Sequence, residues 1–206
     1  MKIYFQIIAF ILLLIPLSCN GQNDRENTKI VGGGCEGCEA LLEYGDKKLS
    51  PVDTLPLFDE TEPKLKISGT VYENDGKTPA KDVILYIYHT NREGIYPKKG
   101  DERGWARRHG FIRGWIKTDN SGRYTFYTFR PASYPDSSEP EHIHLTIKES
   151  GTNEYYLDDF VFEDDPLIKK TKFANRGGSG VMKPVTRDDM LYIERDIILG
   201  LNIPGY

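Results

Sequence analysis

Short strand-like segments between residues 65 and 199 constrain the fold more than any other feature of this 206-residue chain. Each segment is rich in β-branched and aromatic residues, and turn-forming residues such as Asp75-Gly76 and Asp119-Asn120-Ser121-Gly122 lie between several of them. The segments cover residues 65–72, 83–89, 111–118, 123–129, 142–148, 155–162 and 190–199. Because no long helical pattern separates them, we predict an all-β fold, an antiparallel β-sandwich with a short irregular N-terminal extension. The sequence Asp119-Asn120-Ser121-Gly122 predicts a hairpin turn.

Two histidines, His142 and His144, lie two residues apart in one predicted strand. Such a pair is common in ordinary strand packing, so it indicates a metal only together with other ligands. Alternate side chains of a strand point to opposite faces, so both imidazoles should face one side. With Tyr96 and Tyr134 they could form a four-ligand site that leaves a position open for chemistry. Phenolate is a hard anionic donor, which favours Fe(III) over Zn or Cu(I).

Three stretches around these residues follow a known motif order. They are residues 88–97, residues 118–135, and Glu-Pro-Glu-His-Ile-His-Leu at 139–145. Their order resembles that of the intradiol ring-cleavage dioxygenases, the protocatechuate and catechol dioxygenase family, over residues 66–206.

The resemblance implies a β-sandwich that binds a non-haem Fe(III) ion through Tyr96, Tyr134, His142 and His144. It implies cleavage of a catechol-type ring between its two hydroxyls with O2, giving a muconate-type diacid. The substrate would chelate the metal and displace Tyr134, the catalytic ligand, while Tyr96 stays bound. The partners implied are therefore a small aromatic diol and O2.

Glu139 departs from the family pattern, which has an arginine three residues before the first histidine. In the family that arginine stabilises negative charge on the substrate, whereas a carboxylate should repel an anionic substrate. Arg113, Arg123 or Arg130 could supply a guanidinium instead. A second hypothesis is therefore a catalytically weak iron- or catecholate-binding β-sandwich lipoprotein. A third, an adhesion or carbohydrate-binding sandwich, predicts no metal and makes the Tyr/His set coincidental.

The first 18 residues have the pattern of an export signal. Lys2 precedes an apolar run over residues 7–17 that is short for a transmembrane helix, and Leu17-Ser18-Cys19 is similar to a lipoprotein cleavage site. We predict a signal peptide over 1–18, lipidation of Cys19, a tether and irregular segment over 19–64, and the dioxygenase-like β-sandwich over 65–206. The protein would be an exported, periplasmic or outer-membrane-anchored lipoprotein, attached to the membrane through its lipid only. The alternative is a plain secretory signal cut nearby.

Cys35 and Cys38 form a Cys-x-x-Cys motif, which is typical of zinc binding, thiol redox chemistry or a local disulfide. Zinc needs further thiolate or imidazole partners, and no second such motif occurs in the sequence. In an oxidising compartment a small structural disulfide is the preferred interpretation. Small exported relatives of the dioxygenases also carry a similar stretch, so it resembles a family feature.

The charged loop over residues 98–108 has two interpretations. It is a solvated loop, or it is a rim of the substrate site at which Trp105 and Arg107 or Arg108 meet an aromatic acid. His89 and His109 lie outside the ligand motif, and we predict structural roles for both. The formal net charge of -4 and the mixed distribution of charges do not indicate a nucleic-acid partner, and the sequence leaves the oligomeric state open.

Overall fold

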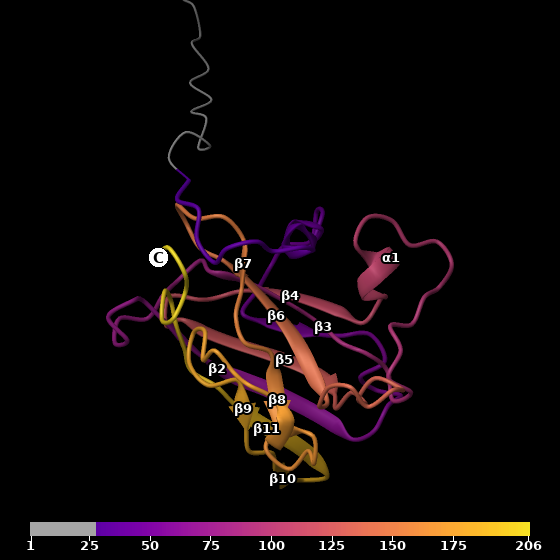
Figure 1. The fold of residues 1–206 in the computed structure, drawn as a ribbon. Helices are drawn as coiled ribbons and strands as arrows, with labels where there is room; N and C mark the ends of the chain where they lie inside the picture. The colour runs from indigo at the N-terminus through magenta and orange to yellow at the C-terminus, as the bar shows by residue number, and fades with distance from the viewer. Residues whose placement is uncertain (1–27) are drawn as a thin grey trace, which may run out of the picture.

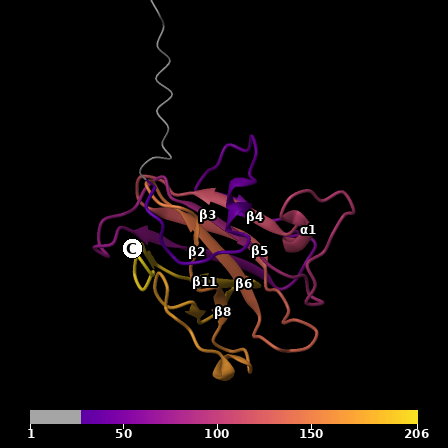
Figure 2. The same cartoon turned by 45° about the horizontal axis from the view of Figure 1, so that its top comes forward.

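Two β-sheets pack face to face in the computed structural model, which describes residues 28–206 (Figure 1). The view in Figure 2, turned by 45°, shows the same two layers with α1 at one end and the C-terminus at the other. The predicted β-sandwich is therefore confirmed. The predicted signal peptide over 1–18, Cys19 and residues 20–27 of the predicted tether lie outside the described residues.

The first sheet has the strand order β1-β5-β2-β11-β10, with β12 beside β2. Its strands are β1 (Val52–Thr54), β2 (Lys64–Tyr72), β5 (Arg123–Phe129), β10 (Val185–Arg187), β11 (Met190–Glu194) and β12 (Ile197–Ile198). The long β2–β5 pairing is antiparallel, whereas β1 pairs with β5, and β11 and β12 pair with β2, in parallel. Alternation of apolar residues does not encode strand direction, which is why the sequence predicted antiparallel pairing throughout.

The second sheet has the order β4-β3-β6-β8-β9, with β7 beside β6. Its strands are β3 (Ile84–Tyr88), β4 (Arg113–Lys117), β6 (His142–Lys148), β7 (Tyr155–Tyr156), β8 (Phe160–Phe162) and β9 (Val181–Met182). Three short helices complete the described chain: η1 (Cys38–Leu42), α1 (Ala106–His109) and η2 (Ile168–Lys170).

The hairpin predicted at residues 119–122 is wrong. The turn does form, since Asp119 Oδ1 accepts the backbone N–H groups of Ser121 and Arg123. However, β4 before it lies in the second sheet and β5 after it lies in the first. The Gly122 carbonyl accepts the Val71 N–H, so the turn is attached to β2. The turn therefore connects the two sheets, because turn chemistry fixes only the local change of direction.

Period-two alternation places one face of each central strand in the core. In β6, Ile143, Leu145 and Ile147 are buried between the sheets, and Leu85 and Ile87 do the same in β3. The residues between them point to the outer face of the second sheet. There a smaller apolar cluster of Ala40, Leu41, Tyr86 and Trp115 forms where η1 covers the sheet. His142 and His144 lie on this outer face, towards one end of β6.

Residues 28–64 pack onto the sandwich. Val31 and Leu55 are both buried in the main core. The Gly32 N–H donates to the Pro204 carbonyl, which ties this segment to the C-terminal end of the chain. Within the segment 19–64, predicted as a tether and irregular segment, β1 adds a short parallel strand to the edge of the first sheet.

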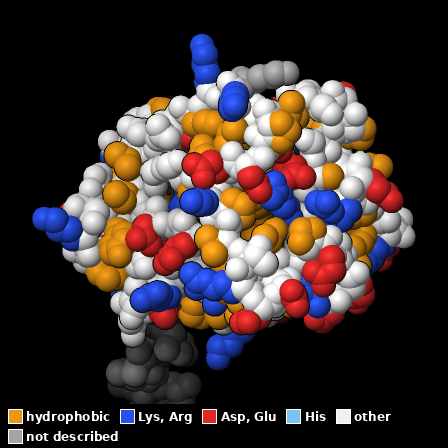
Figure 3. Space-filling view, turned by 90° about the horizontal axis from the view of Figure 1, so that it is seen from below, with side chains coloured by type: hydrophobic (Ala, Val, Ile, Leu, Met, Phe, Trp, Pro, Cys, Tyr) orange, Lys and Arg blue, Asp and Glu red, His pale blue; other side chains and the backbone are white. Residues whose placement is uncertain are grey.

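The surface carries charges of both signs. On the face shown in Figure 3, Lys and Arg side chains are interspersed with Asp and Glu. Among residues 28–206, no helix has the length and apolarity that crossing a bilayer requires.

Candidate metal centre

The structure brings the four predicted ligands together. His142 and His144 come from β6, Tyr96 from the loop between β3 and α1, and Tyr134 from the loop between β5 and β6. The Tyr96 hydroxyl oxygen lies 2.7 Å from both the Tyr134 hydroxyl and His144 Nε2. The Tyr134 hydroxyl lies 3.2 Å from His142 Nε2 and 3.4 Å from His144 Nε2. Two oxygens and two nitrogens therefore surround one point.

The two tyrosine loops are tied to each other, which fixes both phenols. The Thr90 hydroxyl donates to the Ala132 carbonyl, and the Ala132 N–H donates to the Asn91 carbonyl. Gly94 lies between Asn91 and Tyr96 in the first of these loops and has φ +75°. A Cβ at this position would lie 2.1 Å from the Ser133 carbonyl oxygen in the second loop. Only glycine permits this combination of positive φ and close backbone approach.

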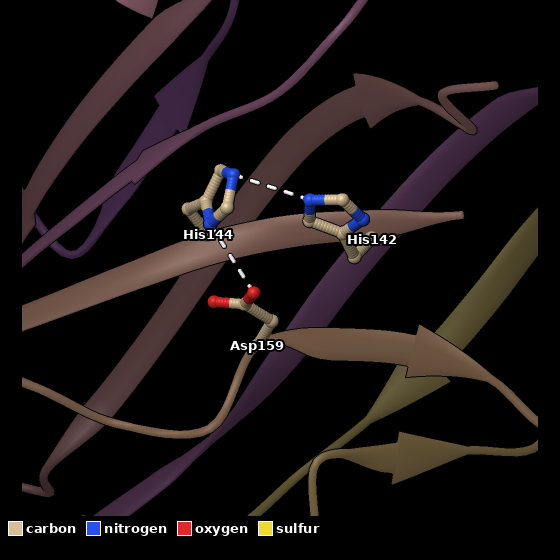
Figure 4. Close-up of side chains that lie close together, drawn as sticks. All are labelled: His142, His144 and Asp159. Atoms are coloured by element: carbon tan, nitrogen blue, oxygen red, sulfur yellow. Dashed lines mark hydrogen bonds and ion pairs between the residues drawn. The ribbon is translucent and has the colours of Figure 1, made fainter. Parts of the chain in front are cut away.

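Each histidine is oriented through its second ring nitrogen. His142 Nδ1 lies 2.7 Å from the Pro140 carbonyl oxygen, and His144 Nδ1 lies 3.2 Å from Asp159 Oδ2. A carbonyl or an ionised carboxylate only accepts, so both imidazoles carry their proton on Nδ1 when neutral. Their Nε2 atoms, each of which then carries a lone pair, lie 3.2 Å apart. Figure 4 shows the two rings with these nitrogens turned toward each other. Two lone pairs at this distance repel unless a proton or a cation lies between them, which fits a metal.

Burial sets the protonation of the ligands in the absence of a cation. It raises the pKa of Tyr96 well above the ordinary value, and the neighbouring Tyr134 hydroxyl adds to this shift. Burial also raises the pKa of Tyr134. Burial, and then the adjacent His144, lowers the pKa of His142. A trivalent cation would reverse the shift of the phenols, because it favours the phenolate form. Neutral imidazoles and cation-stabilised phenolates make a donor set that suits Fe(III).

Asp159, just before β8, is a residue of the candidate site that the sequence did not predict. With His142 and His144 it forms a group that could itself hold a metal. Its carboxylate, however, contacts Nδ1 of His144, whereas the Tyr96 hydroxyl contacts Nε2 of the same ring, so Asp159 orients a ligand. Burial works to raise the pKa of Asp159, but the two imidazoles outweigh it and hold the pKa below the usual range. No spacing rule connects an orienting carboxylate to the His-x-His pair, so only the fold reveals it.

Glu139 lies beside the centre, with Oε2 3.9 Å from His142 Nε2 and its side chain 58% exposed. The arginines considered as substitutes for the family arginine are placed elsewhere. Arg113 pairs with Glu43, and Arg130 pairs with Glu141 and Asp164. Arg123 is exposed on β5 in the first sheet. Glu139 therefore places a negative charge beside His142, and none of these three arginines pairs with it.

Two cavities meet at the ligand cluster. The larger, of about 630 Å³, is lined by His142, His144, Glu139, Asp159, Phe173 and Arg176 among others. The smaller, of about 290 Å³, is lined by Tyr96, Tyr134, His144, Tyr88, Trp105 and Arg108 among others. The larger has the size of an ordinary small-molecule site. Arg108 lines the smaller cavity beside Trp105, whereas Arg107 is not among its lining residues, and a contact of this rim with substrate stays a prediction.

The two remaining histidines differ in their surroundings. His89 is buried, with Nδ1 2.7 Å from the Thr90 carbonyl and Nε2 2.6 Å from the Thr128 hydroxyl. This placement is the predicted structural one. His109 instead lines the smaller cavity and stacks on Tyr88 at 3.8 Å between ring centroids. Burial lowers the pKa of His109 to about 4, so its ring is neutral at physiological pH.

Cys35 and Cys38 are joined by a disulfide. The loop between them contributes Glu36 to the smaller cavity.

Fold and site together define a β-sandwich with a two-tyrosine, two-histidine candidate metal centre. The dioxygenase family model matches residues 44–191, and the chain belongs to this family, the intradiol ring-cleavage dioxygenases. This membership does not favour the adhesion or carbohydrate-binding hypothesis.

Known proteins agree with the family and the fold. Catechol 1,2-dioxygenase 1 of Acinetobacter lwoffii is 29% identical over 153 residues, which cover 73% of this chain and 46% of that protein. The chain spans less than half the length of the curated relatives that it matches. The crystal structure of 3-chlorocatechol 1,2-dioxygenase from Rhodococcus opacus 1CP has a TM-score of 0.57 at 21% identity, covering 75% of this chain and 66% of that one.

The dioxygenase domain of a carbohydrate-binding fusion protein from Streptomyces sp. SirexAA-E has a TM-score of 0.53 at 22% identity, covering 66% of this chain and 79% of that one. At these identities the structural likeness establishes the fold alone.

Proposed function

We propose that this protein is a non-haem Fe(III) intradiol dioxygenase, which opens a catechol-type ring between its two hydroxyls with O2 to give a muconate-type diacid. The observation that carries the proposal is the convergence of two phenol oxygens and two imidazole lone pairs, each imidazole oriented by its own Nδ1 acceptor. The similarity to catechol 1,2-dioxygenases supports the reaction type.

In this proposal Tyr96, Tyr134, His142 and His144 hold the metal. Fe(III) would supply the Lewis acidity that binds both diol oxygens and activates the diol towards O2 without an external reductant. The resemblance to the family motif assigns Tyr134 as the ligand that the substrate displaces. Its hydroxyl lies within 3.4 Å of both imidazoles and 2.7 Å from the Tyr96 hydroxyl, so it belongs to the same cluster. A Tyr134 oxygen freed from the metal would be a base that could accept a proton from a catechol hydroxyl.

The test is a visible absorption spectrum of the iron-loaded protein, before and after catechol is added under argon. We expect a broad tyrosinate-to-iron charge-transfer band that moves to longer wavelength with catechol and decays when air is admitted. Tyr96→Phe should weaken the band. Tyr127→Phe, which changes a tyrosine of β5 in the first sheet, is the matched control and should leave the band unchanged.

The outcomes separate the hypotheses. A band that moves with catechol and then persists in air, with no oxygen consumed, would identify an iron- or catecholate-binding protein in place of an enzyme. A colourless protein that takes up no iron would overturn the metal centre.

We further propose that the protein is exported and lipidated at Cys19. The proposal rests on the sequence pattern at residues 1–19.

A further inference from the structure

The disulfide loop lies against the outer face of the second sheet. Cys38 begins η1 and is 3% exposed, and Ala40 and Leu41 of η1 are buried against Tyr86 and Trp115. Gly37, between the two cysteines, has φ +91°, a conformation that favours glycine. The disulfide therefore closes a tight loop whose second half is anchored in the apolar cluster.

The loop contacts His109 directly. A Cβ built at Gly37 would lie 3.0 Å from His109 Nε2 and 3.3 Å from the Trp105 ring. Glu43, the residue that follows η1, fixes the start of α1, because its Oε1 accepts the Trp105 N–H at 2.8 Å. His109 is also fixed from the sheet, with its Nδ1 2.9 Å from the Tyr86 hydroxyl. The loop therefore forms the outer support of the His109 ring.

A row of stacked rings leads from His109 to the candidate metal centre. His109 and Tyr88 stack with centroids 3.8 Å apart and planes 5° apart. Tyr88 stacks on His144 at 4.4 Å, and the two residues are register partners in the β3–β6 pair. A shift of the disulfide loop would thus reach a proposed iron ligand through two ring contacts.

The loop also supplies one wall of the smaller cavity. Glu36 lines this cavity together with Tyr96, Tyr134 and His144, and it forms an ion pair with Arg108 on the same rim. Both partners are exposed, so the ion pair contributes little to stability. The ion pair instead affects the shape and charge of the opening of the smaller cavity.

We propose that the loop closed by the Cys35–Cys38 disulfide is a specificity-determining wall of the active site, which positions the His109–Tyr88 stack against His144 and closes the smaller cavity with Glu36 and Arg108. This inference rests on the proposed function and adds a positioning role for the disulfide loop. The loop is a positioning element, which acts on His144 through His109 and Tyr88 and on the smaller cavity through Glu36 and Arg108.

The experiment compares the iron-loaded protein with a Cys35→Ser, Cys38→Ser double variant. The dissociation constant for catechol is measured under argon from the shift of the charge-transfer band, and again with 4-tert-butylcatechol as a bulky probe. We expect the double variant to keep the resting iron band, to bind catechol about fivefold more weakly or worse, and to lose discrimination between the two diols. In oxygen-uptake assays KM should rise more than kcat falls.

A second variant probes the same loop with the disulfide intact. Gly37→Ala keeps both cysteines but places a methyl group against His109, and it should alter the same two dissociation constants. Leu42→Ser, at a half-exposed position of η1, is the control and should change neither.

Unchanged affinities and unchanged discrimination in a folded double variant, or in Gly37→Ala, would overturn the inference. A missing iron band in the unmodified protein would instead overturn the proposed function, so the two failures are distinguishable.

Discussion

The two histidines of the candidate centre have different acceptors on Nδ1. His142 donates to a neutral carbonyl, that of Pro140, and His144 donates to the carboxylate of Asp159. A carboxylate draws the Nδ1 proton more strongly than a carbonyl and so makes the opposite nitrogen more electron-rich. His144 should therefore be the stronger of the two imidazole donors.

Replacing Asp159 tests this difference. We expect Asp159→Asn to weaken Fe(III) binding about 10- to 100-fold, because the amide holds the His144 ring less firmly and no longer polarises it. Iron affinity is measured by competition with a chelator. Asp158→Asn is the control, since it changes a neighbouring acid of the same cavity and keeps an oxygen that can accept the Asn175 N–H. Equal iron affinities in the two variants would contradict the assigned role.

Glu139 should set the charge preference of the site. Removing its negative charge with Glu139→Gln should raise the affinity for 3,4-dihydroxybenzoate, relative to uncharged catechol, about threefold to tenfold at low salt. This gain in relative affinity should become smaller as salt is added, because the Glu139 side chain is largely exposed and salt screens its charge. Glu163→Gln, an exposed acid outside the larger cavity, is the matched control. An affinity ratio that does not change with Glu139→Gln would show that this carboxylate does not face the substrate.

At the scale of elements, β6 serves the core with one face and the metal centre with the other. This division was predictable, because period-two alternation separates Ile143 from His142 and His144. The convergence of Tyr96 and Tyr134 was not predictable from alternation, since both lie in loops. Only the motif resemblance placed them in the site. Asp159 could not be found at all, and the turn at 119–122 was assigned to a hairpin because the pattern does not encode which sheet a strand joins.

The two faces of β6 can be perturbed separately. Ile143→Ala should lower the free energy of unfolding by about 2–5 kcal/mol, because Ile143 is fully buried between the sheets. Ile143→Val should cost about 0.5–1.5 kcal/mol. Chemical denaturation measures both, and the iron charge-transfer band of the folded variants should be unchanged. A variant with normal stability and an altered band would contradict the assignment of faces.

At the scale of the whole molecule, residues 28–64 are part of the packed sandwich as well as a connection to the N-terminal residues. Val31 and Leu55 occupy the main core, η1 covers the second sheet, and the disulfide loop reaches the smaller cavity. Sequence patterns assigned these residues to an irregular segment, because isolated core residues between Gly, Pro and charged positions have no periodicity to detect.

The proposed lipidation makes a prediction at the same scale. Expressed in a bacterial host, the full chain should partition into the membrane fraction, and Cys19→Ala should move it to the soluble exported fraction. Immunoblots of the fractions measure this. Cys35→Ala is the control, because its cysteine lies outside the predicted cleavage site. Membrane association that survives Cys19→Ala would contradict lipidation at this residue.

The place at which the chain enters the fold has a consequence for access. The Lys29 N–H donates to the Gly151 carbonyl, just beyond the last residue of β6, whereas His142 is the first residue of that strand. Seven strand residues span roughly 20 Å, so the entry point and the candidate centre lie near opposite ends of β6. With a lipid at Cys19, the end of the sandwich nearest the bilayer would be the end remote from the four candidate metal ligands. Diols in the surrounding medium would then reach the candidate centre directly, whereas diols dissolved in the lipid would first have to leave the bilayer.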